Sequence, residues 1–600
     1  MKKIIILLII SFNIYAQENV FFYEIDFIKR NDAFNVTLIT PQLSEKDNVY
    51  SFVSYAPGVH QPLDFGRFVK MFKVYDKDGN ELLTNKISIN NIEILDPTKV
   101  ATIVYEIDDS FDMSTAYHPI YPMSGTGINE SYIIINPHGV FGYFDNLKNN
   151  PIELNLKLEG NPKVGTALNL NKEGNYEVDS YYHLTDSPLL IGDNLSYAST
   201  IIDEIRVEAY VHSPSDKITA QMVLDEAKSI LNAAKDFIGY SPVDRYTFLM
   251  YFASDSDLIQ MPVFNSGGAL EHSLSSTYAL PDMPQYLPVL KNIIAHEFMH
   301  ILSPLHLHSN VLANFDYSNP VSEDKHVWLY EGVTEWVSYI MQVKSGVVTI
   351  DDYLNYLSDK AINSDNYDSA YSLARISREW STDEGNKQYG NIYQLGALTA
   401  AMLDIKLIQL SDGSKGLREV YLELIKKYGK ENPFDNDTFF DTLVDMTYPE
   451  ISDFIDKHIM NNTPFDFEKD FAAIGIKYFA KKISDNKEPL FGLQFGTNNN
   501  KYVIHGFSKE HKDFGLKVGD VVEKVFGEVV TLENSDVVFA KKKTMKAGDW
   551  YEIVVSRDGE MVELNGRLIE RMNYYVLEID EEASKEAQEL RARWSRYFKS

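Results

Sequence analysis

The pentad His296-Glu297-Phe298-Met299-His300 places two imidazoles and a carboxylate at the spacing that a catalytic zinc site requires. On a helix, residues four apart lie on one face with Cβ atoms about 5–6 Å apart, so His296 and His300 can bind one ion. Glu297 then lies beside the open coordination position. There a carboxylate can take a proton from zinc-bound water, whose pKa falls from about 15.7 to about 7. The pentad therefore predicts a zinc hydrolase with Glu297 as its general base.

The residues around the pentad indicate a buried helix. Apolar residues recur at helical spacing from Val289 to Ile301, and Ser303-Pro304 would end the helix just past the second histidine. Burying two histidines without partners is costly. This cost favours a ligand role for both.

A catalytic zinc ion takes a third protein ligand, and two residues are candidates. His306 follows His300 at the spacing of the metzincin endopeptidases, but Ser303 stands where that motif has a glycine. Glu331 lies on a second predicted helix, from about residue 326 to 344, and antiparallel packing on the first helix would direct its carboxylate to the zinc. Glu335, one turn further on, is either an exposed glutamate or the acceptor of a ligand histidine's free ring N–H. The two candidates for the third ligand imply different enzyme classes.

Two segments resemble the glycyl aminopeptidase family of gluzincin zinc metallopeptidases. One is the pentad followed by Trp-Leu-Tyr-Glu-Gly-Val-Thr-Glu at 328–335, and the other is Gly-Gly-Ala-Leu-Glu-His-Ser at 267–273, in which Ala269 departs from the family signature. The resemblance implies that Glu271 binds the substrate's free amino group, which would make the enzyme an exopeptidase. Gly267 and Gly268 would let the substrate backbone approach the strand, although a plain Gly-Gly turn explains them too.

Downstream, Tyr393-Gln394-Leu395-Gly396 resembles the Tyr-x-x-Gly run of aminopeptidases in this clan and opens a long apolar helix. The resemblance implies that Tyr393 donates a hydrogen bond to the developing oxyanion. Tyr389, one turn earlier, is a rival, and a buried structural tyrosine is the third interpretation. We therefore expect a zinc-dependent aminopeptidase that removes small first residues such as glycine or alanine, and a zinc endopeptidase with the same pentad is the alternative.

Weaker resemblances lie near the N-terminus. The segment Pro57-Gly58-Val59-His60 and the segment Asp186-Ser187-Pro188 resemble stretches of the same family, and both are interpreted as structural turns. His306, His308, Asp316 and Tyr317 are interpreted as loop residues near the site.

Residues 1–16 have the pattern of a secretory signal peptide. Lys2-Lys3 precede an apolar run from Ile4 to Ile10, and Ala16 allows cleavage before Gln17. The chain has no cysteine, so disulfides and a thiol nucleophile are excluded. We expect export to a bacterial periplasm or to the medium.

The remaining chain is predicted as an α+β multidomain protein. Short strand patterns predict an all-β domain over 17–210, and helical patterns predict a thermolysin-like, mostly helical zinc catalytic domain over 211–470. Residues 475–570 resemble a PDZ domain, in which Phe491-Gly492-Leu493 would bind a peptide C-terminus, or which would only buttress the catalytic domain. Residues 571–600 are predicted as a helical tail because opposite charges recur there at i, i+4.

The formal net charge of −31 disfavours binding to nucleic acid or to anionic membranes. After the signal peptide no apolar run reaches about 18 residues, so we expect no membrane span in the mature chain. Peptides are the expected partners. A non-catalytic protein that binds peptides through the PDZ-like module is a third hypothesis, and the intact Glu297 argues against it.

Overall fold

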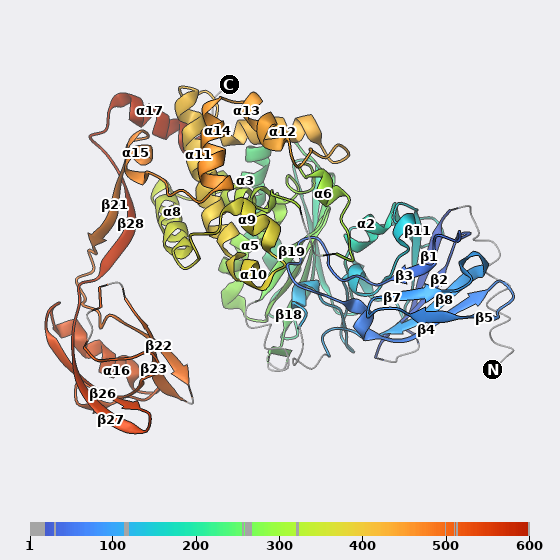
Figure 1. The fold of residues 1–600 in the computed structure, drawn as a ribbon, viewed down its shortest axis with the longest axis horizontal. Helices are drawn as coiled ribbons and strands as arrows, with labels where there is room; N and C mark the ends of the chain where they lie inside the picture. Colours follow the sequence, from blue (N-terminus) through green and yellow to red (C-terminus); the bar gives the residue numbers. More distant parts are fainter. Residues whose placement is uncertain are drawn as a thin grey trace. The chain divides into compact units, whose positions relative to one another are not determined.

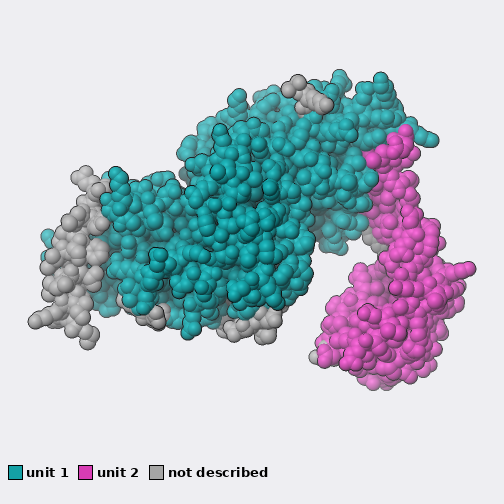
Figure 2. Space-filling view, turned by 180° about the vertical axis from the view of Figure 1, so that it is seen from behind, with its two compact units in different colours: residues 1–475, 582–600 teal, residues 476–581 magenta. Residues whose placement is uncertain are grey.

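The computed structural model describes residues 19–28, 32–112, 119–254, 257–258, 267–319, 323–498, 500–508, 510–511 and 514–597 (Figure 1). The predicted signal peptide at 1–16 lies outside the described residues. Two compact units make up the chain, one of residues 1–475 and 582–600 and the other of residues 476–581, coloured separately in Figure 2. Among the described residues, no helix is both long and apolar enough to cross a membrane.

The first unit begins with a β-rich domain, as the sequence predicts. Its main sheet has the strand order β13-β14-β11-β1-β2-β8-β4-β5, and two smaller sheets have the orders β12-β15-β10-β9 and β3-β7-β6. The strands are β1 (Phe21–Asp26), β2 (Phe34–Ile39), β3 (Val49–Ser51), β4 (Val69–Asp76), β5 (Glu81–Leu82), β6 (Thr84–Lys86), β7 (Asn91–Ile94), β8 (Val100–Ile107), β9 (Gly127–Ile128), β10 (Ile133–Ile135), β11 (Ile152–Lys157), β12 (Lys163–Gly165), β13 (Asn169–Leu170), β14 (Tyr176–Val178) and β15 (Leu189–Gly192), and the short helix α2 (Tyr181–Thr185) lies between the last two.

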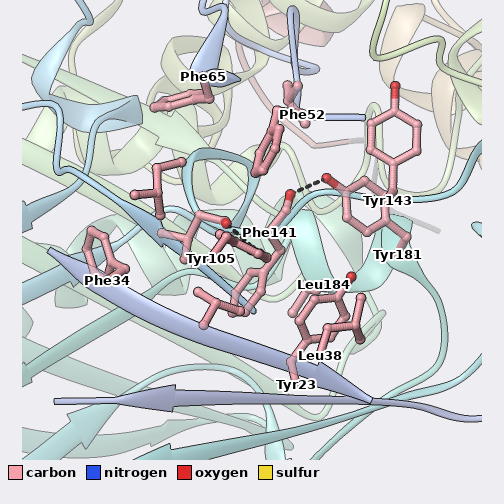
Figure 3. Close-up of a cluster of buried hydrophobic side chains, with 14 of the residues drawn as sticks. Tyr23, Phe34, Leu38, Phe52, Phe65, Tyr105, Phe141, Tyr143, Tyr181 and Leu184 are labelled. Carbon is pink, nitrogen blue, oxygen red and sulfur yellow. Dashed lines mark hydrogen bonds between the residues drawn. The ribbon is translucent and has the colours of Figure 1, made fainter. Parts of the chain in front are cut away.

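Alternating side chains explain how the main sheet buries one face. In β2 the alternate residues Phe34, Val36 and Leu38 are fully buried, while the residues between them are not. Figure 3 shows the aromatic core that they join. The segment 140–142 crosses this core, and its carbonyl groups accept hydrogen bonds from the hydroxyls of Tyr105, Tyr181 and Tyr23. A loop without strand partners is thereby tolerated inside the domain.

The part of the first unit that was predicted as the catalytic domain holds a five-stranded sheet with the order β16-β17-β18-β20-β19. Its strands are β16 (Ser196–Ile202), β17 (Ile205–His212), β18 (Arg245–Ala253), β19 (Gly268–Glu271) and β20 (Ser275–Pro281). The predicted domain boundary at residue 210 falls inside β17, which pairs in parallel with β18. A local pattern shows that a strand is present but not which strand it pairs with, so the predicted boundary assigns β16 and most of β17 to the wrong domain. The strand β19 lies at the edge and pairs only with β20.

Helices make up most of the catalytic part (Figure 1). They are α3 (Ala220–Ile238), α5 (Leu287–Met299), α6 (Asn310–Ala313), α7 (Thr334–Lys344), α8 (Ile350–Ser364), α9 (Leu373–Glu379), α10 (Asp383–Gln388), α11 (Ala397–Leu410), α12 (Leu417–Tyr428), α13 (Phe439–Asp445), α14 (Glu450–Ile455), α15 (Phe467–Ala472) and α17 (Lys585–Trp594). Two π-helical turns, η8 (Trp328–Val333) and η9 (Ile392–Gly396), precede α7 and α11. Helix α17 joins this unit because the buried Lys344 ammonium donates to the carbonyls of Trp594 and Arg596 at its end.

The second unit is a β domain whose described residues include one α-helix. It contains β21 (Ile476–Ile483), β22 (Leu493–Asn498), β23 (Lys501–Phe507), β24 (Val521–Val525), β25 (Glu528–Val529), α16 (Ser535–Ala540), β26 (Trp550–Arg557), β27 (Glu560–Arg567) and β28 (Met572–Ile579). The chain enters through β21 and leaves through β28, which pair antiparallel. The segment predicted as a helical tail from residue 571 therefore starts with a strand, and its helix is α17.

Candidate active site

Helix α5 presents the two histidines of the pentad to one point. Pro288 stands in its first turn, where a missing backbone N–H costs nothing, and the helix reaches His300 at its C-cap. Residues Ile294 to Met299 are all buried, so the helix lies inside the domain as predicted. The imidazole rings of His296 and His300 are 4.8 Å apart between centroids.

Glu331 completes the group from the π-helical turn η8. Its Oε2 lies 3.3 Å from His296 Nε2 and 3.8 Å from His300 Nε2. These three residues form a buried set whose donor atoms all lie within 4.8 Å of one another. Two ligands of a tetrahedral zinc ion are about 3.3–3.5 Å apart, given zinc–ligand distances of about 2.0–2.2 Å. The donor set therefore fits a single zinc ion.

Hydrogen bonds at the other ring nitrogens direct both Nε2 atoms toward the Glu331 carboxylate. The Nδ1–H of His296 donates to Glu335 Oε2 at 2.8 Å, and that of His300 donates to the carbonyl of Ser303 at 2.8 Å. This arrangement fixes the tautomer in which Nε2 carries the lone pair. Burial lowers the pKa of His300 to about 4, which keeps its lone pair available near neutral pH.

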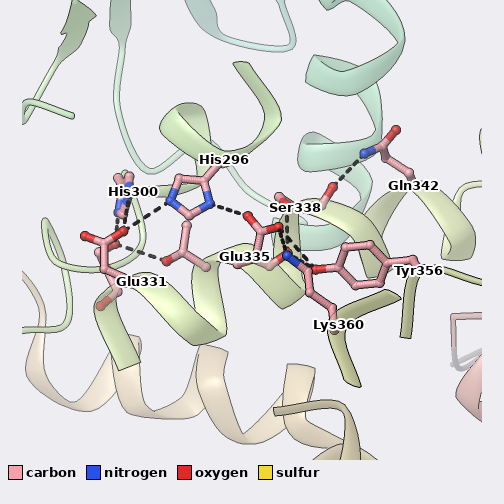
Figure 4. A network of polar contacts seen from close by, with 10 residues as sticks. His296, His300, Glu331, Glu335, Ser338, Gln342, Tyr356 and Lys360 are labelled. Carbon is pink, nitrogen blue, oxygen red and sulfur yellow. Dashed lines mark hydrogen bonds and ion pairs between the residues drawn. The ribbon is translucent and has the colours of Figure 1, made fainter. Parts of the chain in front are cut away.

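A buried network supports His296 from behind (Figure 4). Glu335 accepts from His296 through Oε2 and from the Lys360 ammonium through Oε1 at 2.7 Å. The Tyr356 hydroxyl donates to the backbone carbonyl of Glu335 at 3.1 Å. Of the two interpretations of Glu335, the structure has the one in which it accepts the ring N–H of His296. Sequence reasoning missed Lys360, although a lysine one turn after Leu357 on the apolar face of α8 is a recognisable signal.

Glu297 is buried beside this group. Its Oε2 has no hydrogen-bond partner among the described residues, and it lines the same cavity as the three candidate ligands. Burial raises the pKa of Glu297 to about 8, although the neighbouring His296 opposes the shift. A carboxyl with a pKa near the working pH can both accept and return a proton.

The edge strand β19 brings Glu271 to the same place. Carboxylate and ring atoms of Glu271, Glu297 and His300 lie within 4.8 Å of one another. Burial and the neighbouring Glu331 raise the pKa of Glu271 well above its usual range. A cation would relieve this crowding of acids. Gly268 lines the cavity, whereas Gly267 precedes β19 with φ +57° and does not.

Tyr393 lies in the second π-helical turn, η9, with its ring centroid 5.7 Å from that of His296. Burial raises its pKa well above the usual range, so the phenol keeps its proton and remains a donor. The rival Tyr389 also lines the cavity, 5.9 Å from Tyr393 between ring centroids. The two tyrosines therefore form one wall.

The cavity has a volume of about 600 Å³, and its lining includes the three candidate ligands, the three other glutamates and both tyrosines, namely His296, His300, Glu331, Glu297, Glu271, Glu335, Tyr389 and Tyr393. Its lining comes from the catalytic helices, from β19 and from the N-terminal domain, which contributes Gly58, Val59, His60, Tyr121, Met123 and Ser124. The other candidate third ligand, His306, does not join the donor set. Its Nδ1 pairs with the backbone carbonyl of Ile301 at 2.6 Å.

Comparisons with known proteins agree with this geometry. Residues 22–193 match the family model of the peptidase M61 N-terminal domain, and residues 289–399 match that of M61 glycyl aminopeptidase. The resemblance found in the sequence is thereby confirmed. A search of curated proteins finds no match.

Among solved structures, the chain is similar to an aminopeptidase N family protein from Idiomarina loihiensis, with 19% identity and a TM-score of 0.76 over 96% of this chain and 99% of that one. It is also matched with yeast LTA4 hydrolase, with 15% identity and a TM-score of 0.44 over 76% of this chain and 68% of that one. The first likeness establishes the fold.

Proposed function

We propose that this chain, which matches the family models of the peptidase M61 N-terminal domain and of M61 glycyl aminopeptidase, is a zinc-dependent aminopeptidase acting on small first residues such as glycine or alanine. One observation carries the proposal. The carboxylate of Glu271 lies next to the buried His296, His300 and Glu331 donor set, inside one cavity. An acid at this position pairs with the substrate's ammonium group and places the first peptide bond at the metal.

A zinc ion held by His296, His300 and Glu331 would polarise the substrate carbonyl and lower the pKa of a bound water. Glu297 would take a proton from the attacking water and return it to the leaving amine. Tyr393 donates its hydroxyl hydrogen to the carbonyl oxygen as that oxygen gains charge. Glu335 and Lys360 hold His296 in the orientation that coordination needs.

Hydrolysis of free and N-acetylated glycyl and alanyl peptides tests the proposal, with bound zinc measured on the same protein. We expect the free peptides to be cleaved one residue at a time and the acetylated ones to resist. The Glu271→Gln variant keeps the shape of the side chain and removes the charge, so it should lose most kcat/KM on free peptides. Internal cleavage of blocked peptides, with Glu271→Gln fully active, would instead identify an endopeptidase.

We propose in addition that residues 475–570 act as a PDZ-like module for a peptide C-terminus. Two features support this. Strand β22 ends the strand order of its sheet, so its outer edge could take up a peptide strand, and Gly492 just before it has φ +74°, which turns the chain into this strand. A peptide with a free C-terminal carboxylate should bind to the full chain, and the same peptide with a C-terminal amide should not.

Export through a signal peptide at 1–16 also remains our proposal. The N-terminal sequence of the protein recovered from its native host tests it, and a mature chain starting at Gln17 is the expected result.

A further inference from the structure

The loop 56–60 of the N-terminal domain reaches into the candidate active site. Gly58, with φ +71°, lies so close to Glu271 that a Cβ atom there would be 2.7 Å from Glu271 Oε1. The sequence alone predicts no more than a structural turn for this loop. Its contact with the carboxylate that would anchor the substrate places it at the substrate's N-terminal end.

His60, two residues further along the loop, lines the same cavity. Its ring packs on Tyr389 with centroids 3.9 Å apart and an interplanar angle of 32°, and meets the Trp380 ring edge-on at 5.1 Å. Neither of its ring nitrogens contacts solvent, and neither has a hydrogen-bond partner in the described part of the chain. The Tyr389 hydroxyl beside it is unpartnered in the same way.

The unpartnered polar atoms of His60 and Tyr389 lower the stability of the fold. A buried hydrogen-bonding group without a partner shifts the folding equilibrium about ten- to hundredfold toward the unfolded state. The ring contacts with Tyr389 and Trp380 need only an aromatic face, which a phenylalanine would supply without that penalty. The nitrogens of His60 therefore serve no contact within the folded chain that the structure describes.

On the basis of the proposed aminopeptidase function, we infer that His60 is a substrate-binding residue that hydrogen-bonds the first peptide group of the substrate. A neutral imidazole offers one donor and one acceptor, which match the C=O and N–H of a peptide group. The placement follows from the neighbours of His60. Its loop contacts Glu271 through Gly58, and its ring lies on Tyr389, one turn before Tyr393, so the loop and ring of His60 contact neighbours of both the amine anchor and the oxyanion donor.

Charge near neutral pH is compatible with this role. Burial lowers the pKa of His60 to about 4, so the ring is neutral where the enzyme works and does not repel the substrate's ammonium group. The backbone of the loop is also fixed, since the Asn386 side-chain amide donates to the carbonyl of His60 at 3.1 Å. The ring is thus held in place before substrate arrives.

The His60→Phe variant tests the inference because it keeps the aromatic contacts and removes both nitrogens. We expect kcat/KM to fall about ten- to hundredfold, with bound zinc unchanged and the melting temperature equal to or above that of the wild type. His212→Phe is the matched control. His212 is also a buried histidine stacked on a tyrosine, with its ring 5.6 Å from that of Tyr251, but it does not line the cavity. This control should keep the wild-type kcat/KM.

Both variants are assayed on free and on N-acetylated peptides, because His60 would contact the peptide group and not the amine. If the wild type cleaves only acetylated peptides, the aminopeptidase proposal fails, and His60 is still judged on those substrates. An unchanged kcat/KM in His60→Phe would overturn the inference. So would a loss of kcat/KM accompanied by a lower melting temperature, which is the sign of a structural role.

Discussion

The two π-helical turns that carry Glu331 and Tyr393 contact each other at Gly332 and Gly396. Substituting one of these glycines should lower activity, although neither glycine has a side chain that takes part in the chemistry. A Cβ atom on Gly332 would lie 2.7 Å from the Cα of Gly396 and 3.0 Å from the carbonyl oxygen of Ile392. Carbon atoms in contact are normally about 3.5–4.0 Å apart. In the Gly332→Ala variant, η8 and η9 must therefore separate by about 1 Å.

This separation acts on both functional residues at once. Glu331 is the direct neighbour of Gly332, and Tyr393 lies in the turn that ends at Gly396. A displacement of about 1 Å at a catalytic group can lower the rate about a hundredfold. Overpacking of this kind destabilises a protein by about 1–3 kcal/mol. We expect Gly332→Ala to lose about two orders of magnitude in kcat/KM, to bind zinc more weakly, and to unfold at a lower temperature.

The Gly346→Ala variant separates the effect on the site from the effect on stability. Gly346 follows α7, the helix that η8 leads into, and has φ +74°; among the described residues, no atom lies within 4 Å of the position that a Cβ atom would take there. Alanine at this position is strained by about 1–2 kcal/mol but displaces nothing. It should lose stability to a similar extent and keep its kcat/KM. The reasoning is refuted if Gly332→Ala retains wild-type kcat/KM and zinc affinity, or if both variants lose activity equally.

Three further outcomes follow from the same contacts. Glu297→Gln should lower kcat about a hundredfold or more while bound zinc, measured by atomic absorption, stays at the wild-type level; equal turnover would exclude Glu297 as the base. Lys360→Met should weaken zinc binding about 10- to 100-fold in a chelator competition, because Glu335 loses the cation that holds it against His296. The third outcome concerns Asp404 and stability. Burial raises the pKa of Asp404 from 3.8 to about 6, so between these values the folded state holds a proton that the unfolded chain releases. The contribution of this proton to the stability of the fold is therefore fully present below pH 3.8 and is lost as the pH rises through 6. Relative to the wild type, Asp404→Asn should therefore gain about 3 kcal/mol of unfolding free energy between pH 3 and pH 7 in denaturant titrations, and a pH-independent difference would contradict this.

The parts of the site that the sequence predicts are those set by local geometry. His296 and His300 converge because four residues make about one helical turn, and this holds wherever the helix lies. The second helix is also predicted from its own pattern. The sequence pattern does not predict that the turn carrying Glu331 is π-helical. The extra residue in that turn is stabilised by the packing of η8 on η9, and the local sequence does not encode this packing.

The same distinction explains the domain boundary. The alternating residues of β16 and β17 predict strands correctly, but they do not encode that β17 pairs with β18 across the helix α3 between them. Parallel pairing is a long-range choice made by the whole sheet. A boundary drawn where the strand pattern stops is therefore displaced by two strands.

The groups that sequence reasoning left out of the site come from other domains or other helices. Lys360 reaches Glu335 from α8, and the loop 56–60 reaches Glu271 from the N-terminal domain. A Pro-Gly pair followed by a histidine has the composition of a turn, and it is a turn. Its second property, a histidine with unpaired ring nitrogens in the wall of the cavity, exists only after the two domains pack. Under the proposed function the cleft must be closed beyond the substrate's first residue, and residues of the N-terminal domain line the cavity beside Glu271. Under the proposed function, the restriction to N-termini would thus depend on the loop 56–60 as well as on Glu271, although the two lie more than two hundred positions apart in the sequence.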